Sequence, residues 1–154
     1  DDLIIRLIQE RLAGDDCAVG FIMDGFPRTV TQAEAFDAML EKVGRGVDRV
    51  VAIEVDDDEI VDRLGARRVC KCGSSYHLLY NPPKAEGFCD DCGGEVYLRE
   101  DDQGDTVRAR LATYHDQTAP VAKYYAKKDL LRPVAGVGSI EEIFASIVTA
   151  VEGS

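Results

Sequence analysis

The sequence predicts an α/β protein with a mostly parallel sheet, into which a small subdomain is inserted. Short apolar segments that are typical of buried strands occur at residues 19–23, 49–55 and 130–136. Between them lie longer stretches whose apolar residues recur with the period of a helix. Residues 68–104 break this alternation, because they combine paired cysteines with glycine and proline and show little helical period. Strands that alternate with helices favour a parallel sheet covered by helices.

The first elements follow from apolar spacing and from capping patterns. Residues 2–13 carry an apolar stripe at helical spacing, and glycine and aspartate residues after it predict the end of that helix. After the strand at 19–23, Thr29 and Gln32 form a capping-box pattern, which predicts the start of a helix. The strand at 49–55 precedes a helix that we expect over about residues 57–67.

The later elements follow the insertion. Asp105 is a candidate cap for a long helix that extends to about residue 118, and Pro120 restarts a helix toward residue 128. A Ser-x-x-Glu pattern at Ser139 predicts the last helix. We expect three parts, namely core residues 1–67, an insertion at residues 68–104 and core residues 105–154.

The overall charge excludes some classes of partner. The chain has 154 residues and a formal net charge of −11, whereas proteins that bind nucleic acids are usually basic. No apolar run approaches the length of a membrane span. We therefore expect no nucleic-acid partner and no membrane partner.

Several arginines lie near apolar helix faces, where an anion or a long path to solvent is needed. Arg63 and Arg67 lie close to the face that carries Ile60 and Leu64, if the helix continues through residue 67. Any one such arginine could simply extend its side chain to solvent or pair with one of the many acidic residues. Together, however, they favour a site for polyphosphate, because arginine binds phosphate with two hydrogen bonds. The set is Arg28, Arg63, Arg67, Arg99 and Arg110.

Two cysteine pairs in the insertion predict a structural zinc site. Cys89-x-x-Cys92-Gly is typical of a zinc knuckle, and Cys70-x-Cys72-Gly is its natural partner. Four thiolates close the coordination sphere, so the metal would be structural. Because the first pair is one residue shorter than usual, His77, Asp90 or Asp91 could replace one thiolate, and the cysteines could also be merely buried and reduced. We expect Cys17, which stands apart, to be a small core residue.

Five segments together resemble the adenylate kinases, in the bacterial form with a long lid. These are GFIMDGFPRTVTQAEAF, VDRLGARRVC, SYHLLYNPPKAEGFCDDCGG, LREDDQGDTVRARLATYHDQTAPVAKYY and GSIEEIF. The resemblance implies a P-loop-type nucleoside monophosphate kinase core with a zinc-knuckle lid at residues 68–104. It implies reversible phosphoryl transfer from ATP to AMP, giving two ADP, with Mg²⁺ bound to ATP and structural Zn²⁺ in the lid. We also expect a cytoplasmic monomer.

The resemblance also implies a role for each matching residue. For AMP, these are Gly25, Arg28 and Gln32, although Gln32 could also serve as a helix-capping residue. Arg63 and Gly138 would contact the adenine of ATP, and Arg67 its phosphates. The catalytic residues would be Arg67, Arg99 and Arg110, the last two also binding AMP, together with Asp24, which would orient Mg²⁺ through water. Asp101 and Asp102 would lie at the lid hinge and pair with Arg99 and Arg110.

One family motif does not occur in these residues, and two other interpretations remain open. The sequence contains no G-x-x-x-x-G-K-[ST] phosphate loop, so we expect an amino-terminally truncated adenylate kinase that is inactive as it stands. One alternative is a non-catalytic zinc-ribbon interaction module that binds nucleotide. The other is a related GTP:AMP phosphotransferase.

This expectation gives a first prediction. Residues 1–154 alone should show no conversion of ATP and AMP to ADP in a coupled assay. A chimera in which a family-type phosphate-loop segment precedes residue 1, called the phosphate-loop chimera below, should be active. Measurable turnover by the 154 residues alone would contradict this assignment of the catalytic parts.

Overall fold

The computed structural model describes residues 2–153 and divides them into two compact units, which are described separately. The first unit contains the residues up to Glu54 together with those from Thr113 onward, and the second is Val55–Ala112. Helices alternate with strands along the first unit, and its two strands are parallel, so the predicted α/β class is confirmed. None of the helices in the described residues is long and apolar enough to cross a membrane.

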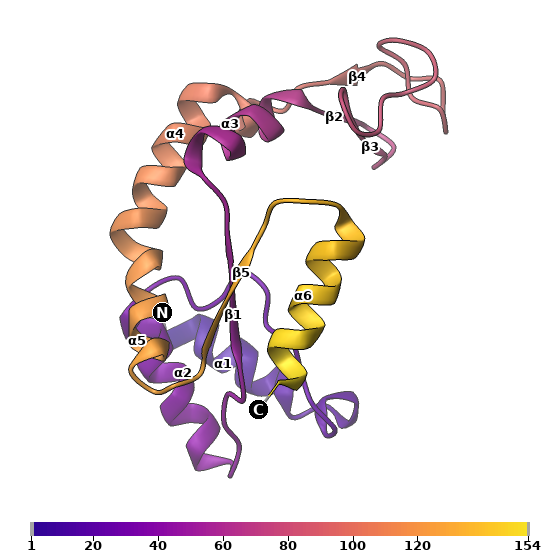
Figure 1. Ribbon diagram of the computed structural model, residues 1–154. Coiled ribbons are helices and arrows are strands. Elements are labelled where there is room, and N and C mark those ends of the chain that lie inside the picture. Colours follow the sequence, from indigo (N-terminus) through magenta and orange to yellow (C-terminus); the bar gives the residue numbers. More distant parts are fainter. Residues whose placement is uncertain (1, 154) are drawn as a thin grey trace. The chain divides into compact units, whose positions relative to one another are not determined.

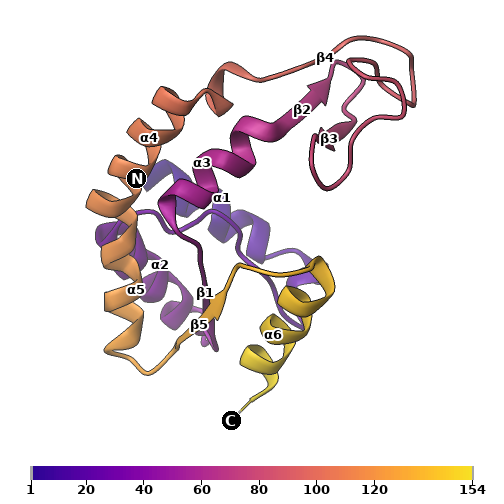
Figure 2. The same cartoon turned by 45° about the horizontal axis from the view of Figure 1, so that its top comes forward.

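The first unit is built around one pair of parallel strands. β1 (Val50–Glu54) pairs with β5 (Leu131–Ala135) along its whole length, with Val50 opposite Leu131. Figures 1 and 2 show α6 (Ile140–Glu152) on one side of this pair, and α2 (Val30–Lys42) and α5 (Ala119–Ala126) on the other. Both strands and all three helices match segments that the sequence predicted.

The core of the first unit lies along α2. Phe36, Met39 and Leu40 are buried, and apolar side chains of α1 (Asp2–Leu12) pack against them. At the start of α2, the hydroxyl of Thr29 accepts a hydrogen bond from the backbone N–H of Gln32, with an N–O distance of 3.2 Å. The predicted cap and the predicted apolar face are therefore both present, and they fix where α2 begins and which side it buries.

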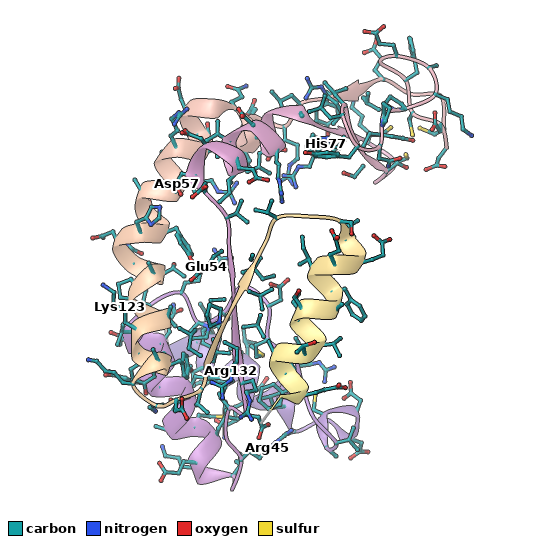
Figure 3. All side chains as sticks on the ribbon, in the orientation of Figure 1. Arg45, Glu54, Asp57, His77, Lys123 and Arg132 are labelled. Carbon is teal, nitrogen blue, oxygen red and sulfur yellow. The ribbon has the colours of Figure 1, made fainter. Side chains whose placement is uncertain are left out.

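The predicted strand at residues 19–23 is wrong. The segment is not a strand, and the side chains of Val19 and Ile22 are 100% and 95% exposed. A strand needs a neighbour for its backbone hydrogen bonds, and no strand among residues 2–153 pairs with this one. Arg45, labelled in Figure 3, holds the segment instead, because it donates to the carbonyl of Cys17 at 2.7 Å and covers the ring of Phe21.

The second unit begins with α3 (Asp57–Ala66), which is followed by a small antiparallel sheet. β2 (Arg67–Cys70) lies between β3 (Ser75–His77) and β4 (Val96–Tyr97). The expectation that Arg67 belongs to the helix is wrong: Arg67 has extended backbone angles and pairs with His77 in the ladder. Pairing in the sheet here outweighs the helical pattern, which is a local signal only.

The chain returns to the first unit through a nearly continuous helical segment. After η2 (Glu100–Asp102), α4 spans Gly104–Thr113, and η3 (Tyr114–Thr118) is a π-helical turn. α5 follows directly, with Pro120 in its first turn, where the missing N–H costs nothing. The π-helical turn was not predicted, because its wider winding leaves no distinct residue pattern.

Asp37 connects α2 to α5. Its carboxylate accepts hydrogen bonds from the hydroxyls of Tyr124 and Tyr125 at 2.9 and 3.1 Å, and from the ammonium group of Lys128 at 2.5 Å. The hydrogen bond to Asp37 raises the pKa of Lys128 to about 12. Because Tyr125 is only 1% exposed, its hydroxyl depends on this carboxylate for a partner.

We therefore predict that Asp37→Ala destabilises the chain by about 1–3 kcal/mol, because it leaves the buried hydroxyl of Tyr125 without its acceptor. Urea unfolding followed by circular dichroism measures the change. Asp48→Ala is the matched control, since it removes the same charge from an exposed position. Equal unfolding midpoints for the two variants would show that the contacts of Asp37 contribute nothing.

Candidate active site and metal site

The first part of the site is the turn that precedes α2. The backbone N–H of Arg28 donates to Oε1 of Gln32 at 2.9 Å, and Nε of Arg28 donates to the carbonyl of Gly25 at 2.8 Å. Gly25 has a φ of 71°, which favours glycine. Within residues 2–153, these bonds leave both terminal nitrogens of Arg28 without a hydrogen bond or an ion pair. The turn therefore fixes the arginine while leaving its phosphate-binding edge available.

Gln32 and Asp24 complete this turn. Gln32 is only 9% exposed, and its backbone N–H donates to the hydroxyl of Thr29. Its side-chain oxygen accepts the N–H of Arg28, one residue before the N-cap, so of the expected capping box the Thr29 bond is present. Asp24 is exposed and has no hydrogen bond or ion pair to other described residues. Its carboxylate is thus accessible at the surface, as an oxygen ligand for hydrated Mg²⁺ needs to be.

The second part of the site is an ion pair in the second unit. Nε and Nη2 of Arg67 donate to the two carboxylate oxygens of Asp102 at 2.9 and 2.6 Å. Asp102 is fully buried, and the hydrogen bond to it raises the pKa of Arg67. The pair joins β2 to η2, where the polypeptide enters α4.

Arg99 and Arg110 lie near the same acidic segment. Arg99 pairs with the carboxylate of Asp101 at 3.0 Å, and Arg110 donates to the carbonyl of Asp101 at 3.4 Å. Three of the predicted arginines therefore meet around Asp101 and Asp102. The resemblance implied that Asp101 and Asp102 pair with Arg99 and Arg110. Arg99 does pair with Asp101, but Arg110 reaches only a backbone carbonyl, and Asp102 pairs with Arg67.

The contacts of Arg63 and Gly138 are local, since each residue meets a glutamate of the helix that it lies on or precedes. Arg63, on α3, forms an ion pair with Glu59 one turn earlier, so pairing with an acidic residue describes it well. Gly138 lies just before α6 with a φ of 123°, and a Cβ there would come within 2.9 Å of a carboxylate oxygen of Glu142. That oxygen accepts the N–H of Ser139 as part of the capping box, so only glycine fits at position 138.

The four cysteines of the second unit form one cluster. The Sγ atoms of Cys70, Cys72, Cys89 and Cys92 all lie within 4.8 Å of one another. Cys70 and Cys92 are 3.4 Å apart at sulfur, and Cys72 and Cys89 are 3.6 Å apart. Zn–S bonds of about 2.3 Å place tetrahedral ligands about 3.8 Å apart, so the cluster fits a Zn²⁺ ion. The short Cys70-x-Cys72 spacing does not prevent both sulfurs from joining it.

The side chains that the sequence offered as replacement ligands make other contacts. Nδ1 of His77, which Figure 3 labels, accepts from the N–H groups of Leu79 and Tyr80. Asp90 accepts from the N–H of Lys84 at 2.8 Å, and Asp91 accepts from the hydroxyl of Ser74 at 2.6 Å. Among the described residues, the ligand atoms that lie together are the four sulfurs, so the candidate ligand set is all sulfur.

No sequence motif indicated the role of Tyr76. Its hydroxyl donates to Sγ of Cys89 at 3.3 Å and accepts from the N–H of Asp90 at 2.8 Å. The bond to Tyr76 lowers the pKa of Cys89 to about 6, so this thiol readily supplies the thiolate that a metal requires. Only the nearness of a tyrosine to the cysteines pointed to this contact, and that alone is weak.

Comparison with known proteins identifies the family. The family model described as adenylate kinase matches residues 1–130. The chain belongs to the adenylate kinase family. It is 52% identical over 153 residues to an adenylate kinase of Carboxydothermus hydrogenoformans. The aligned residues make up 99% of this chain and 72% of that protein. The chain is 49% identical over 154 residues to one from Geotalea daltonii, with 99% and 72% covered, and 47% identical over 152 residues to one from Methanocella arvoryzae, with 98% and 70% covered.

These relatives confirm the predicted enzyme class. The chain is a nucleoside monophosphate kinase, which is a phosphotransferase, and its parallel strands fit the core of such an enzyme. The cysteine cluster supports the expectation of a zinc-knuckle lid. Family membership favours this interpretation over the zinc-ribbon interaction module.

We predict that the chain binds one zinc ion, which native mass spectrometry with and without a chelator will count. Cys89→Ser should abolish the metal, because it removes one of four ligands. Cys17→Ser is the control and should leave the metal in place, since Cys17 lies in the first unit. Four thiols at positions 70, 72, 89 and 92 that react freely with an alkylating reagent in the purified, metal-supplied protein would rule out the zinc site.

Proposed function

We propose that the chain supplies most of the site for reversible phosphoryl transfer between ATP and AMP, which gives two ADP. The turn before α2 would bind AMP, with Arg28 at its phosphate and with Gly25 and Gln32 as further contacts. The main support is the state of Arg28, whose backbone and Nε are fixed while its terminal nitrogens lack partners in the described residues. A guanidinium held this way is ready to form two hydrogen bonds to a phosphate.

The ATP side would be served by Arg63 and Gly138 at the adenine and by Arg67 at the phosphates. Arg99 and Arg110 would contact the phosphates being transferred and the phosphate of AMP. The supporting observation is that Arg67, Arg99 and Arg110 all contact the Asp101–Asp102 segment in the second unit. These carboxylate and carbonyl contacts keep the three guanidinium groups ordered until phosphate oxygens replace them.

Catalysis would consist of positioning and charge neutralisation. In phosphoryl transfer, charge spreads over the oxygens of the moving group, so fixed cations lower the barrier without covalent chemistry. Mg²⁺ supplies further positive charge to the phosphates when it is bound with ATP. Asp24 would orient this ion through water, which its exposed carboxylate permits.

Residues 68–104 would act as the lid, with residues 1–67 and 105–154 as the core. A lid excludes water, which would otherwise accept the phosphoryl group. So few residues cannot bury a large core, and a Zn²⁺ ion bound by four thiolates would hold them folded. The small buried cluster of Cys70, Tyr76 and Cys89 agrees with this view.

We further propose that the enzyme is a cytoplasmic monomer without nucleic-acid or membrane partners. The net charge of −11 supports the first exclusion. GTP remains the alternative donor, and initial rates of the phosphate-loop chimera with ATP or GTP will decide between the two. We expect ATP to give the higher kcat/KM, and a higher value with GTP would identify a GTP:AMP phosphotransferase.

Two substitutions in the phosphate-loop chimera test the assignment of the arginines. Arg28→Ala should weaken the use of AMP by about 1.5–3 kcal/mol in kcat/KM, because it removes a charge-assisted contact. Arg67→Ala should instead reduce kcat and the use of ATP. Steady-state kinetics with each substrate varied in turn measures both.

The outcome that would contradict this assignment is specific. If both variants lost thermal stability to a similar small extent and kept their kinetic constants, the arginines would be structural. Lys42→Ala is a suitable control, because it removes a positive charge from the exposed end of α2, outside the turn.

A further inference from the structure

Side chains hold both of the peptide groups that flank the Cα of Arg28. On one side, Oε1 of Gln32 receives the N–H of Arg28. On the other, the hydroxyl of Thr118 donates to its carbonyl oxygen at 3.0 Å, from a position 90 residues further along the chain. Both contacts lie within the first unit. The resemblance implied no role for Thr118, which the sequence pattern marked only as a helix boundary.

Thr118 uses its hydroxyl differently from the helical Ser146 and Thr149. Both of those residues lie on α6 and donate to the carbonyl four residues earlier, at 2.9 Å, which is the usual local bond for such side chains. Thr118 is the N-cap residue of α5, yet its side chain caps nothing there. It is the last residue of the π-helical turn, and its hydroxyl donates to another segment of the chain.

Packing along α2 and α5 keeps Thr118 in register with Arg28. Three successive contacts join the segment that contains α2 to the segment that contains α5, in the same order along both. Thr118 meets Arg28 first, Val121 lies in the buried cluster with Ala33, and Tyr125 then binds Asp37. A helix pair fixed at the second and third contacts leaves little freedom to the first.

We propose that Thr118 is a positioning residue for AMP, which holds the carbonyl of Arg28 so that the guanidinium keeps the geometry needed for the AMP phosphate. This inference rests on the proposed role of Arg28. Loss of the hydroxyl frees the peptide group that follows the Cα of Arg28 and widens the range of positions that the guanidinium samples. The affinity for AMP then falls, because binding must supply the free energy that orders the arginine.

Steady-state kinetics of the phosphate-loop chimera tests the inference. Thr118→Val keeps the shape and removes the hydroxyl, and it should raise the KM for AMP about two- to tenfold, as expected for one neutral hydrogen bond. The KM for ATP should stay constant. Thr118→Ser keeps a hydroxyl and should restore most of the affinity for AMP. Thr149→Val is the matched control, since it removes a threonine hydroxyl bond from α6.

A double substitution separates positioning from general destabilisation. In the Arg28→Ala background, Thr118→Val should add no further loss of AMP affinity, because the group it positions is gone. Equal effects of Thr118→Val with and without Arg28, or equal effects of Thr118→Val and Thr149→Val, overturn the inference alone. An unchanged KM for AMP in Arg28→Ala overturns the role of Arg28 as well.

Amide hydrogen exchange gives a readout that needs no turnover. Thr118→Val should accelerate exchange at the N–H of Arg28, which faces Gln32 across the same turn, and leave exchange in β5 unchanged. Unchanged exchange at Arg28 would overturn the inference.

Discussion

The fully buried carboxylate of Asp102 is the constraint on which the arrangement of the second unit depends. A buried charge is costly unless it is paired and hydrogen-bonded, and Arg67 meets both of its oxygens. Arg67 must therefore lie where its guanidinium reaches Asp102. It does so as the first residue of β2, directly after α3 ends at Ala66. It also fixes η2 next to β2, and the adjacent Asp101 then lies where Arg99 and Arg110 reach it.

The same contacts reconcile two interpretations of the arginines. Pairing with acidic residues and binding of polyphosphate looked like alternatives in the sequence. In the structure, Arg63, Arg67 and Arg99 each have a carboxylate partner, while Arg28 has none among the described residues. An acidic chain can thus keep strongly basic groups ordered, and phosphate has only to compete with those carboxylates.

Much of the fold could be predicted because its signals are local. The cap at Thr29, the capping box at Ser139 and the apolar spacing of α2 each involve residues within a few positions of one another. The errors concern partners that local patterns do not reveal. A strand at residues 19–23 depends on a neighbouring strand, and the state of Arg67 depends on Asp102 far along the chain. For the same reason, cysteine spacing found the metal ligands but not Tyr76, and no pattern indicated Thr118.

The all-sulfur character of the cysteine cluster has a consequence for metal selectivity. Thiolates are soft ligands that prefer zinc, whereas Mg²⁺ is a hard ion that binds oxygen and keeps much of its water. With Asp90 and Asp91 hydrogen-bonded to Lys84 and Ser74, the cluster presents no oxygen ligand of its own. The chemistry of the ligands would therefore sort the two metals. A zinc ion at the four sulfurs would not be displaced by a large excess of the Mg²⁺ that accompanies nucleotides.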